Sequence, residues 1–258
     1  MIPSADILGV RVHRLTMAEA VAVAGAWLRR GGPPAHIVTA HTAMLRQARA
    51  DPALRALLNG ADLTTPDGAG ILLVGRILGV RFPERVPGVD LADALCALCA
   101  REGYSVFLLG ARPGIAEAAA ANLIRAHAGL RIAGTHHGYF RPEEEGLVVA
   151  RIREARPRLL LVALGFPAQE LWIARHRRDL GVPVSIGVGG SLDVFAGRLS
   201  RAPRWVQRLG LEWAWRTAQE PRRRWRVVAS IPPVLWLAAR ERLRARATGR
   251  GTGDSIDR

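Results

Sequence analysis

Hydrophobic positions along the chain alternate between short continuous runs and longer segments, rich in Ala and Leu, with helical spacing. The short runs predict strands at 7–12, 36–40, 61–65, 105–110, 131–138, 159–165 and 184–189. The longer segments predict helices at 16–30, 42–58, 88–102, 114–128 and 167–180. Strands that are apolar on both faces and separated by helices are typical of a parallel sheet covered on both sides. The pattern therefore predicts an α/β fold with a Rossmann-like, mostly parallel sheet flanked by helices.

Polar or glycine-rich loops follow five of the predicted strands. Open α/β sheets bind their ligands outside the carboxyl ends of the strands, where such loops lie. The five loops are TAHT (39–42), TTPDGAG (64–70), GARPG (110–114), GFPAQE (165–170) and GVGGSLD (187–193). We expect them to converge on one crevice.

The loop TTPDGAG holds a single carboxylate, Asp67, between a proline and a glycine. Pro66 fixes its own φ angle, while Gly68 and Gly70 permit positive φ and close backbone approach. Pro-Asp-Gly is also ordinary turn chemistry. Its place at the expected crevice favours the interpretation of Asp67 as a functional carboxylate.

Two glycine turns are candidate contacts for a phosphate or a ribose. Backbone amides between Gly110 and Gly114, at a helix start, can cradle a phosphate. GARPG nevertheless lacks the full G-x-G-x-x-G spacing of a dinucleotide site. In GVGGSLD, Gly189 and Gly190 form the turn, and Asp193 either accepts a hydrogen bond from a ribose hydroxyl or caps a helix.

The first turn after the strand at 159–165 carries Gln169 and Glu170. Gln169 can bind a sugar hydroxyl, while Glu170 can simply favour the helix dipole. The D-x-D motif that holds a metal and a diphosphate in one large class of transferases is absent from the sequence. We therefore expect no metal, with arginines neutralising any diphosphate leaving group.

Charge is concentrated near the C-terminus. The chain carries 37 basic residues, all arginine, against 22 acidic ones, a net charge of +15 that implies an anionic partner. Residues 198–246 contain 13 of the arginines, 3 glutamates and five of the seven tryptophans. We therefore divide the chain into an α/β catalytic core at 1–197, an Arg- and Trp-rich appendage at 198–246 and a disordered tail at 247–258.

No segment predicts secretion or a membrane span. The N-terminus lacks the basic start and apolar stretch of a signal peptide, and the longest apolar run, 227–239, is too short to cross a bilayer. The two cysteines, Cys96 and Cys99, lie three apart on a predicted amphipathic helix and are expected to be core residues of a protein in the reducing cytoplasm.

Several motifs in the same order resemble the WecG/TagA/CpsF glycosyltransferases of bacterial cell-surface polymer synthesis. They are ILGVRVHRLTMAEAV, TPDGAG, ERVPGVDL, GYSVFLLGARPG, LRIAGTHHGYF, LLLVALGFPAQELWI and the segment from IGVGGSLDVFAGRLSRAPRW to PRRRWR. The resemblance covers roughly residues 6 to 235. It implies an inverting, metal-independent transfer of N-acetylmannosamine or a related hexose. The donor would be a UDP-sugar and the acceptor a sugar linked to polyprenyl diphosphate, in synthesis of a cell-wall polymer or an exopolysaccharide.

The resemblance also implies roles for individual residues. Asp67 matches the proposed general base, Thr39 and Gln169 match sugar-site residues, and Arg85 matches a functional arginine. The arginines thought to close over the diphosphate correspond to Arg216, Arg223 and Arg226. His41 stands where the family commonly has asparagine, so it bears on the identity of the sugar.

An inverting transfer needs a general base held in place on the acceptor's side of the anomeric carbon. The Asp67 carboxylate, on a loop restricted by proline, meets that need. An ordinary aspartate, with a pKa of about 3.9, is already ionised at neutral pH. We expect a peripheral protein on the inner face of the cell membrane, with an anionic membrane surface as partner and no nucleic acid. Whether the protein forms a homo-oligomer is left open by the sequence.

Two other functions remain alternatives at this point. A nucleic-acid-binding protein would fit the basic, tryptophan-rich C-terminal segment. A nucleotide-dependent oxidoreductase would rest on GARPG alone.

Overall fold

A computed structural model describes residues 2–203, 205–206, 212–219 and 228–247. Its strands are β1 (Ser4–Ile7), β2 (Val10–His13), β3 (Ala35–Ala40), β4 (Leu63–Pro66), β5 (Ser105–Gly110), β6 (Arg131–His136), β7 (Leu159–Ala163) and β8 (Val184–Gly187). The helices up to residue 126 are α1 (Met17–Arg30), α2 (Thr42–Ala50), α3 (Pro52–Asn59), α4 (Ala69–Leu78), α5 (Gly88–Glu102) and α6 (Ile115–Ala126). Beyond them lie η1 (Pro142–Glu144), α7 (Glu145–Ala155), α8 (Ala168–Leu180), α9 (Ser191–Phe195), α11 (Glu212–Gln219) and α13 (Ile231–Ala247).

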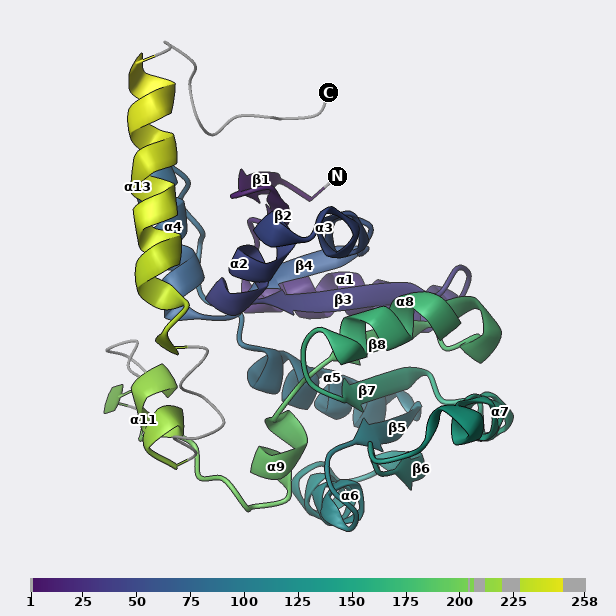
Figure 1. The fold of residues 1–258 in the computed structure, drawn as a ribbon. Helices are drawn as coiled ribbons and strands as arrows, with labels where there is room; N and C mark the ends of the chain where they lie inside the picture. Colours follow the sequence, from purple (N-terminus) through teal and green to yellow (C-terminus); the bar gives the residue numbers. More distant parts are fainter. Residues whose placement is uncertain (1, 204, 207–211, 220–227, 248–258) are drawn as a thin grey trace. The chain divides into compact units, whose positions relative to one another are not determined.

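The strands form an antiparallel hairpin, β1–β2, and a six-stranded sheet in the order β4-β3-β8-β7-β5-β6 (Figure 1). The pairs β3–β8, β8–β7, β7–β5 and β5–β6 are all parallel. Every residue of β3, β4, β7 and β8 is buried, as expected of parallel strands covered on both faces. The predicted α/β class with a parallel sheet flanked by helices is confirmed.

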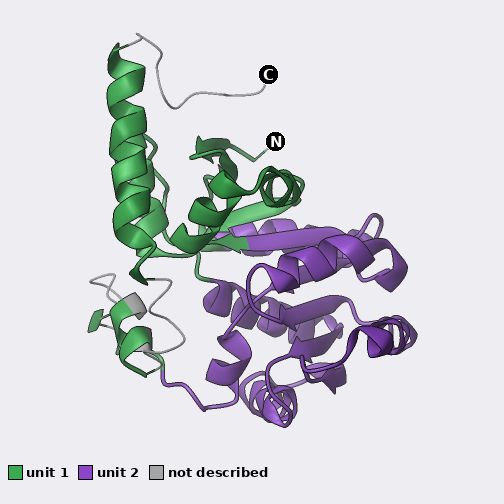
Figure 2. Cartoon of the chain, viewed as in Figure 1, with its two compact units in different colours: residues 1–17, 39–87, 201–258 green, residues 18–38, 88–200 purple. Residues whose placement is uncertain are grey.

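The chain divides into two compact units, each made of segments that are distant in the sequence (Figure 2). Unit 1 consists of Met1–Met17, Thr39–Pro87 and Arg201–Arg258, and unit 2 consists of Ala18–Val38 and Gly88–Ser200. The division falls inside β3, between Val38 and Thr39.

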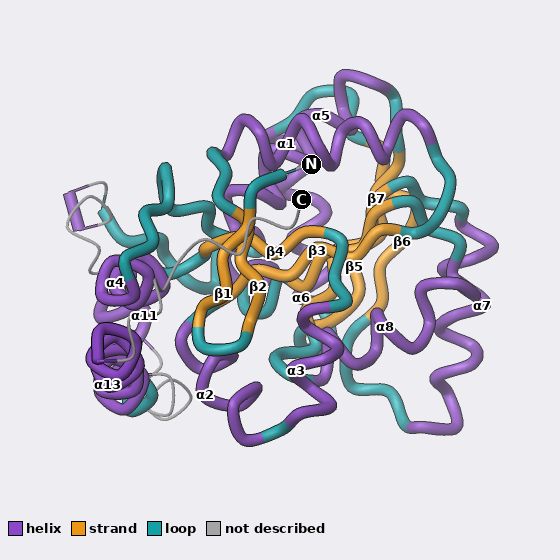
Figure 3. Tube along the Cα trace, turned by 90° about the horizontal axis from the view of Figure 1, so that it is seen from above, coloured by secondary structure: helices purple, strands orange, loops and turns teal. Residues whose placement is uncertain are grey.

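In unit 2, β5 and β7 present alternate side chains to helices α7 and α8. Phe107 and Leu109 of β5 pack with Leu160 and Val162 of β7 in this cluster. The helices contribute Val148, Val149, Ile152, Trp172, Ile173 and Leu180. Because side chains alternate along a strand, Val106 and Leu108 of β5, which are also buried, point to the other face. Figure 3 shows α1 and α5 on that face of the sheet.

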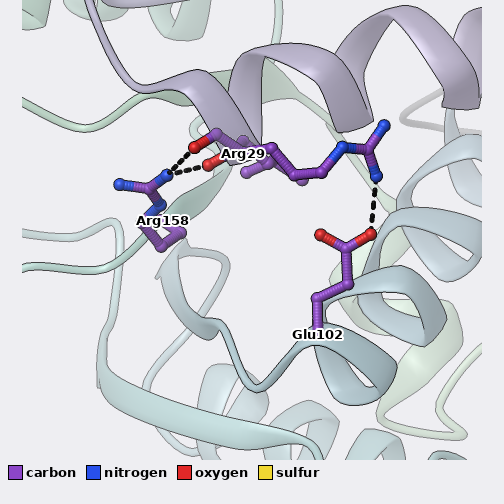
Figure 4. Close-up of polar contacts among 4 residues, drawn as sticks. Arg29, Glu102 and Arg158 are labelled. Carbon is purple, nitrogen blue, oxygen red and sulfur yellow. Dashed lines mark hydrogen bonds and ion pairs between the residues drawn. The ribbon is translucent and has the colours of Figure 1, made fainter.

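Two arginines fix the end of α1 within unit 2 (Figure 4). Arg158 donates hydrogen bonds to the carbonyl oxygens of Leu28 and Arg29, in the last turn of α1. The last carbonyls of a helix have no partner inside the helix, so this guanidinium satisfies two of them. Arg29 forms an ion pair with Glu102 at 2.6 Å, which links α1 to the end of α5.

In unit 1, the long C-terminal helix α13 packs on α4 and α2 (Figure 1). Val234 and Ala238 are fully buried on its inner side. Arg242 donates to the carbonyl oxygen of Leu78 at 3.2 Å, at the end of α4. Just before the helix, the hydroxyl of Ser230 lies 3.4 Å from that of Thr42, the first residue of α2. No helix within the described residues is both long enough and apolar enough to cross a bilayer.

Two predicted elements each correspond to a pair of elements in the structure. The strand expected at 7–12 is a hairpin, which turns at Leu8 and Gly9, both with positive φ. The helix expected at 42–58 is interrupted at Asp51, whose carboxylate caps α3 by accepting from the backbone N–H groups of Ala53 and Leu54. Asp-Pro is a typical helix start, and here it outweighs the continuous apolar spacing.

Candidate active site

Asp67 lies in a corner of unit 1 whose backbone is hydrogen-bonded on both sides. Its own N–H donates to the carbonyl of Ala40, the last residue of β3, at 3.0 Å. The carbonyl of Pro66 accepts from the N–H of Val86 at 2.8 Å, and the hydroxyl of Thr65 donates to the carbonyl of Val86 at 3.3 Å. Asp67 itself is partly exposed. The corner thus holds a partly exposed acidic residue on a fixed backbone.

A buried histidine fixes the strand that leads to this corner. The N–H of Thr64, in β4, donates to His13 Nδ1 at 3.0 Å. This bond requires an unprotonated Nδ1. Burial lowers the pKa of His13, and the nearby Arg11 lowers it further. His13 is therefore a neutral acceptor for the backbone of β4.

Of the two properties expected of the glycines beside Asp67, positive φ and close approach, the structure shows only close approach, at Gly70. Neither Gly68 nor Gly70 has a positive φ. Gly68 is the N-cap of α4, and a Cβ built at Gly70 would lie 2.5 Å from Thr42 Cγ2. Gly70 is therefore needed because α4 begins in close contact with α2.

Three further predicted site residues lie in unit 1 near the same strand ends. Thr39 is a buried residue next to the end of β3. His41 follows β3 directly and is the N-cap of α2. Arg85 is partly exposed and precedes Val86, which bonds to Pro66. The hydrogen bonds at Ala40 and Val86 thus bring the chain around Thr39, His41 and Arg85 to the Asp67 corner.

The side chains of the three predicted C-terminal site arginines are not described by the structure. Arg216 belongs to α11, and its side chain is not described. Arg223 and Arg226 lie outside the described residues.

The other predicted site residues belong to unit 2, at the ends of β5, β7 and β8. Gly110 ends β5 with a φ of 128°, and a Cβ there would lie 2.5 Å from the backbone of Ala163 in β7. Only glycine fits this position. Gly114 has a φ of 84° and is the N-cap of α6, with open space around it.

Gln169 connects α8 to the turn after β8. Its Oε1 accepts from the N–H of Gly189 at 3.0 Å, and the side chain is buried. Gly190 is the N-cap of α9, so Asp193 is not the cap that the sequence left as an alternative. Asp193 is buried, and its carbonyl accepts from the N–H groups of Arg198 and Leu199.

Glu170, which the sequence suggested could simply favour the helix dipole, makes two buried side-chain contacts. It is 0% exposed, and its Oε2 lies 2.7 Å from His36 Nε2, on β3. Its Oε1 accepts from Gln169 Nε2 at 2.9 Å. Sequence reasoning did not single out His36. The signal available was a histidine inside a mostly apolar strand.

Cys96 and Cys99 are both buried. Burial raises the pKa of both Cys96 and Cys99, to about 12 for Cys99, so neither thiol is a ready nucleophile. Among the described residues, His, Cys, Asp and Glu side chains form no group of three or more that could hold a metal ion.

The sheet, with polar and glycine-rich loops after its strands, has the open α/β architecture in which ligands commonly bind outside the carboxyl ends of the strands. A model described as the glycosyl transferase WecG/TagA/CpsF family matches residues 5–248. The chain belongs to this family of glycosyltransferases.

Named relatives are similar in sequence to this chain over most of its length. An N-acetylglucosaminyldiphosphoundecaprenol N-acetyl-beta-D-mannosaminyltransferase of Bacillus spizizenii is 34% identical over 223 residues, which cover 86% of this chain and 85% of the relative. A protein of the same name from Staphylococcus aureus is 34% identical over 236 residues, covering 91% and 92%. A third, from Bacillus subtilis, is 35% identical over 185 residues, covering 72% and 71%.

Proposed function

We propose that the protein transfers N-acetylmannosamine or a related hexose from a UDP-sugar to a sugar linked to polyprenyl diphosphate, with inversion, in the synthesis of a cell-surface polymer. The names of the relatives, which specify such a transfer to N-acetylglucosaminyl-diphosphoundecaprenol, support the sugar and the acceptor. The observation that carries the proposal is the Asp67 corner, where a partly exposed carboxylate sits on a backbone held from both sides.

Asp67 is the general base of this mechanism. The acceptor hydroxyl oxygen forms a bond to the anomeric carbon while its proton passes to the Asp67 carboxylate, and the bond from that carbon to the UDP oxygen breaks. Attack from the face opposite UDP inverts the anomeric configuration. A positioned base of this kind typically contributes 10²- to 10⁴-fold to the rate. The hydrogen bonds at Ala40 and Val86 support the role, because they fix the backbone from which the Asp67 side chain extends.

The leaving UDP gathers negative charge, which arginines stabilise in place of a metal ion. Arg85, beside the Asp67 corner, is one of them in this proposal; Arg216, Arg223 and Arg226 are the others. Thr39, His41 and Gln169 contact the sugar. The glycine turns at Gly110, Gly114, Gly189 and Gly190, with Asp193, hold the nucleotide.

Helix α13 supports a peripheral place on the inner face of the membrane, where a lipid-linked acceptor presents its sugar. Its outer side exposes Trp236 at 60% and Leu243 at 66%, with Arg240 stacked over the Trp236 ring at 5.3 Å. Arg244 and Arg246 lie in its last turn. Tryptophan favours the headgroup region, and arginine is attracted to anionic lipid.

The central experiment measures sugar transfer from UDP-N-acetylmannosamine to a polyprenyl-diphosphate-linked N-acetylglucosamine. We expect Asp67→Asn to keep UDP affinity and to lose at least about 10²-fold in kcat, because only the proton acceptor is removed. Asp62→Asn is the matched control, since Asp62 is exposed just before the same strand. Wild-type turnover in Asp67→Asn with saturating acceptor would remove Asp67 from the mechanism.

A further inference from the structure

A row of three buried polar side chains connects β3 to the Gly189 turn inside unit 2. His36 is 1% exposed, Glu170 is 0% exposed and Gln169 is 3% exposed. The contacts run from His36 Nε2 to Glu170 Oε2 at 2.7 Å, and from Gln169 Nε2 to Glu170 Oε1 at 2.9 Å. They continue from the N–H of Gly189 to Gln169 Oε1 at 3.0 Å.

Strand β8 makes room for this row. A Cβ built at Gly187 would lie 2.5 Å from both Gln169 Nε2 and Glu170 Oε1. The φ of Gly187 is not in the left-handed region, so the backbone conformation does not require glycine there. The absence of a side chain is therefore required by the two polar groups that press against the strand.

Stability alone does not account for the arrangement. Burying a carboxyl and an imidazole costs several kcal/mol unless hydrogen bonds replace those to water. Replacing such a buried pair with well-packed apolar residues of similar volume is often neutral or stabilising. The polar row instead fixes the orientation of the Gln169 amide group. Because Glu170 Oε1 accepts from the Gln169 amide nitrogen, the amide oxygen must face the opposite way, toward the N–H of Gly189.

We propose that His36 and Glu170 are positioning residues that fix the Gln169 amide and, through it, the Gly189–Gly190 turn, so that the donor UDP-sugar meets a preformed site. This role rests on the proposed function, in which Gln169 and the turn contact the donor. His36 orients the carboxyl of Glu170, Glu170 sets the direction of the Gln169 amide, and Gln169 holds the backbone of Gly189.

The test compares Glu170→Leu, which removes both hydrogen bonds, with Glu170→Gln, which keeps an acceptor oxygen for Gln169. Glu145→Leu is the matched control, because Glu145 forms a second His–Glu contact in unit 2, with His176 at 3.0 Å, that does not involve Gln169. If Glu170→Leu does not fold, Gly187→Ala disturbs the same contact while keeping all three polar side chains.

Two readouts are measured on each full-length variant. The first is hydrogen exchange of the Gly189 amide, which needs no substrate. The second is the donor KM and kcat with saturating acceptor. We expect Glu170→Leu to speed Gly189 exchange and to raise the donor KM about tenfold at nearly constant kcat, the effect of losing roughly one hydrogen bond in binding. Glu170→Gln and Glu145→Leu should stay within about twofold of the wild type in both readouts.

A double-variant cycle separates positioning from general packing. In a Gln169→Ala background, Glu170→Leu should not raise the donor KM further, because the residue through which it acts is gone. Unchanged Gly189 exchange in Glu170→Leu or Gly187→Ala would overturn the inference, whatever the substrate is. Faster exchange with an unchanged donor KM would also overturn it. A wild-type protein that binds no UDP-sugar would overturn the proposed function instead, while the exchange measurement still decides the contact.

Discussion

The contact between Gly70 and Thr42 gives the sharpest prediction about the Asp67 corner. In Gly70→Ala, the new Cβ would lie 2.5 Å from Thr42 Cγ2, about 1 Å inside the usual contact distance between carbon atoms. Such overpacking costs about 1–3 kcal/mol, while alanine regains about 0.5–1 kcal/mol over glycine inside a helix. We therefore expect a net loss of up to about 2.5 kcal/mol in the free energy of unfolding.

Thr42→Ser should rescue this variant. Serine lacks Cγ2 but keeps the hydroxyl that lies 3.4 Å from Ser230, and the other Thr42 atoms near the new Cβ are at 3.8 Å, an ordinary contact. Thr42→Ser alone should cost about 1 kcal/mol, the value of one buried methyl group. The double variant should be within about 1 kcal/mol of the wild type, a favourable coupling of about 1–3 kcal/mol.

Urea unfolding of the four proteins at 25 °C measures the coupling, and sugar transfer measures its effect on the Asp67 corner. Gly70→Ala should lose transfer activity that Thr42→Ser restores, because α4 starts two residues after Asp67. Additive effects of the two substitutions on stability would refute the reasoning, since they would mean that α4 moves away from Thr42 without resistance.

Two further predictions concern pH and membrane attachment. Because the pKa of folded His13 lies below 6.5, the unfolded chain takes up the proton first. The stabilisation from neutral His13 is therefore complete above about pH 6.5 and is lost as the pH falls from there through the folded pKa. His13→Gln should weaken the pH dependence of the free energy of unfolding measured in urea. An unaltered pH dependence would exclude this role for His13. Replacing both Trp236 and Leu243 with Gln should reduce sedimentation with anionic vesicles without lowering the melting temperature; equal sedimentation would count against α13 as the contact, and retention of nucleic acid instead would favour a different anionic partner.

The parts of the fold that the sequence predicted well are those where a single local signal decides. The strand at 105–110 and the helix at 88–102 have the predicted bounds, because one is continuously apolar and the other is strongly patterned. Helix α4 was not expected, since its two glycines and its nearly continuous apolar sequence hide the helical period. The hairpin at Leu8–Gly9 was missed because a leucine with positive φ is rare. The two units were not foreseeable, because they join distant segments.

The candidate site divides in the same way. Asp67 could be singled out because proline, glycine and a strand end meet in one short stretch of sequence. The contact between His36 and Glu170 could not be predicted, because it joins residues 134 positions apart. A histidine within a strand and a glutamate in a first helical turn each have ordinary local explanations. Only tertiary structure makes them a pair.

Helix α13 also has a consequence for the order in which the chain folds during synthesis. Unit 2 is complete once residue 200 has been made, whereas unit 1 still lacks everything from Arg201 onward. Until Ile231–Ala247 leaves the ribosome, the sides of α2 and α4 that Val234 and Ala238 will cover remain without that cover. Unit 1, which holds Asp67, can therefore complete its packing only after residue 247 has been made, later in synthesis than unit 2.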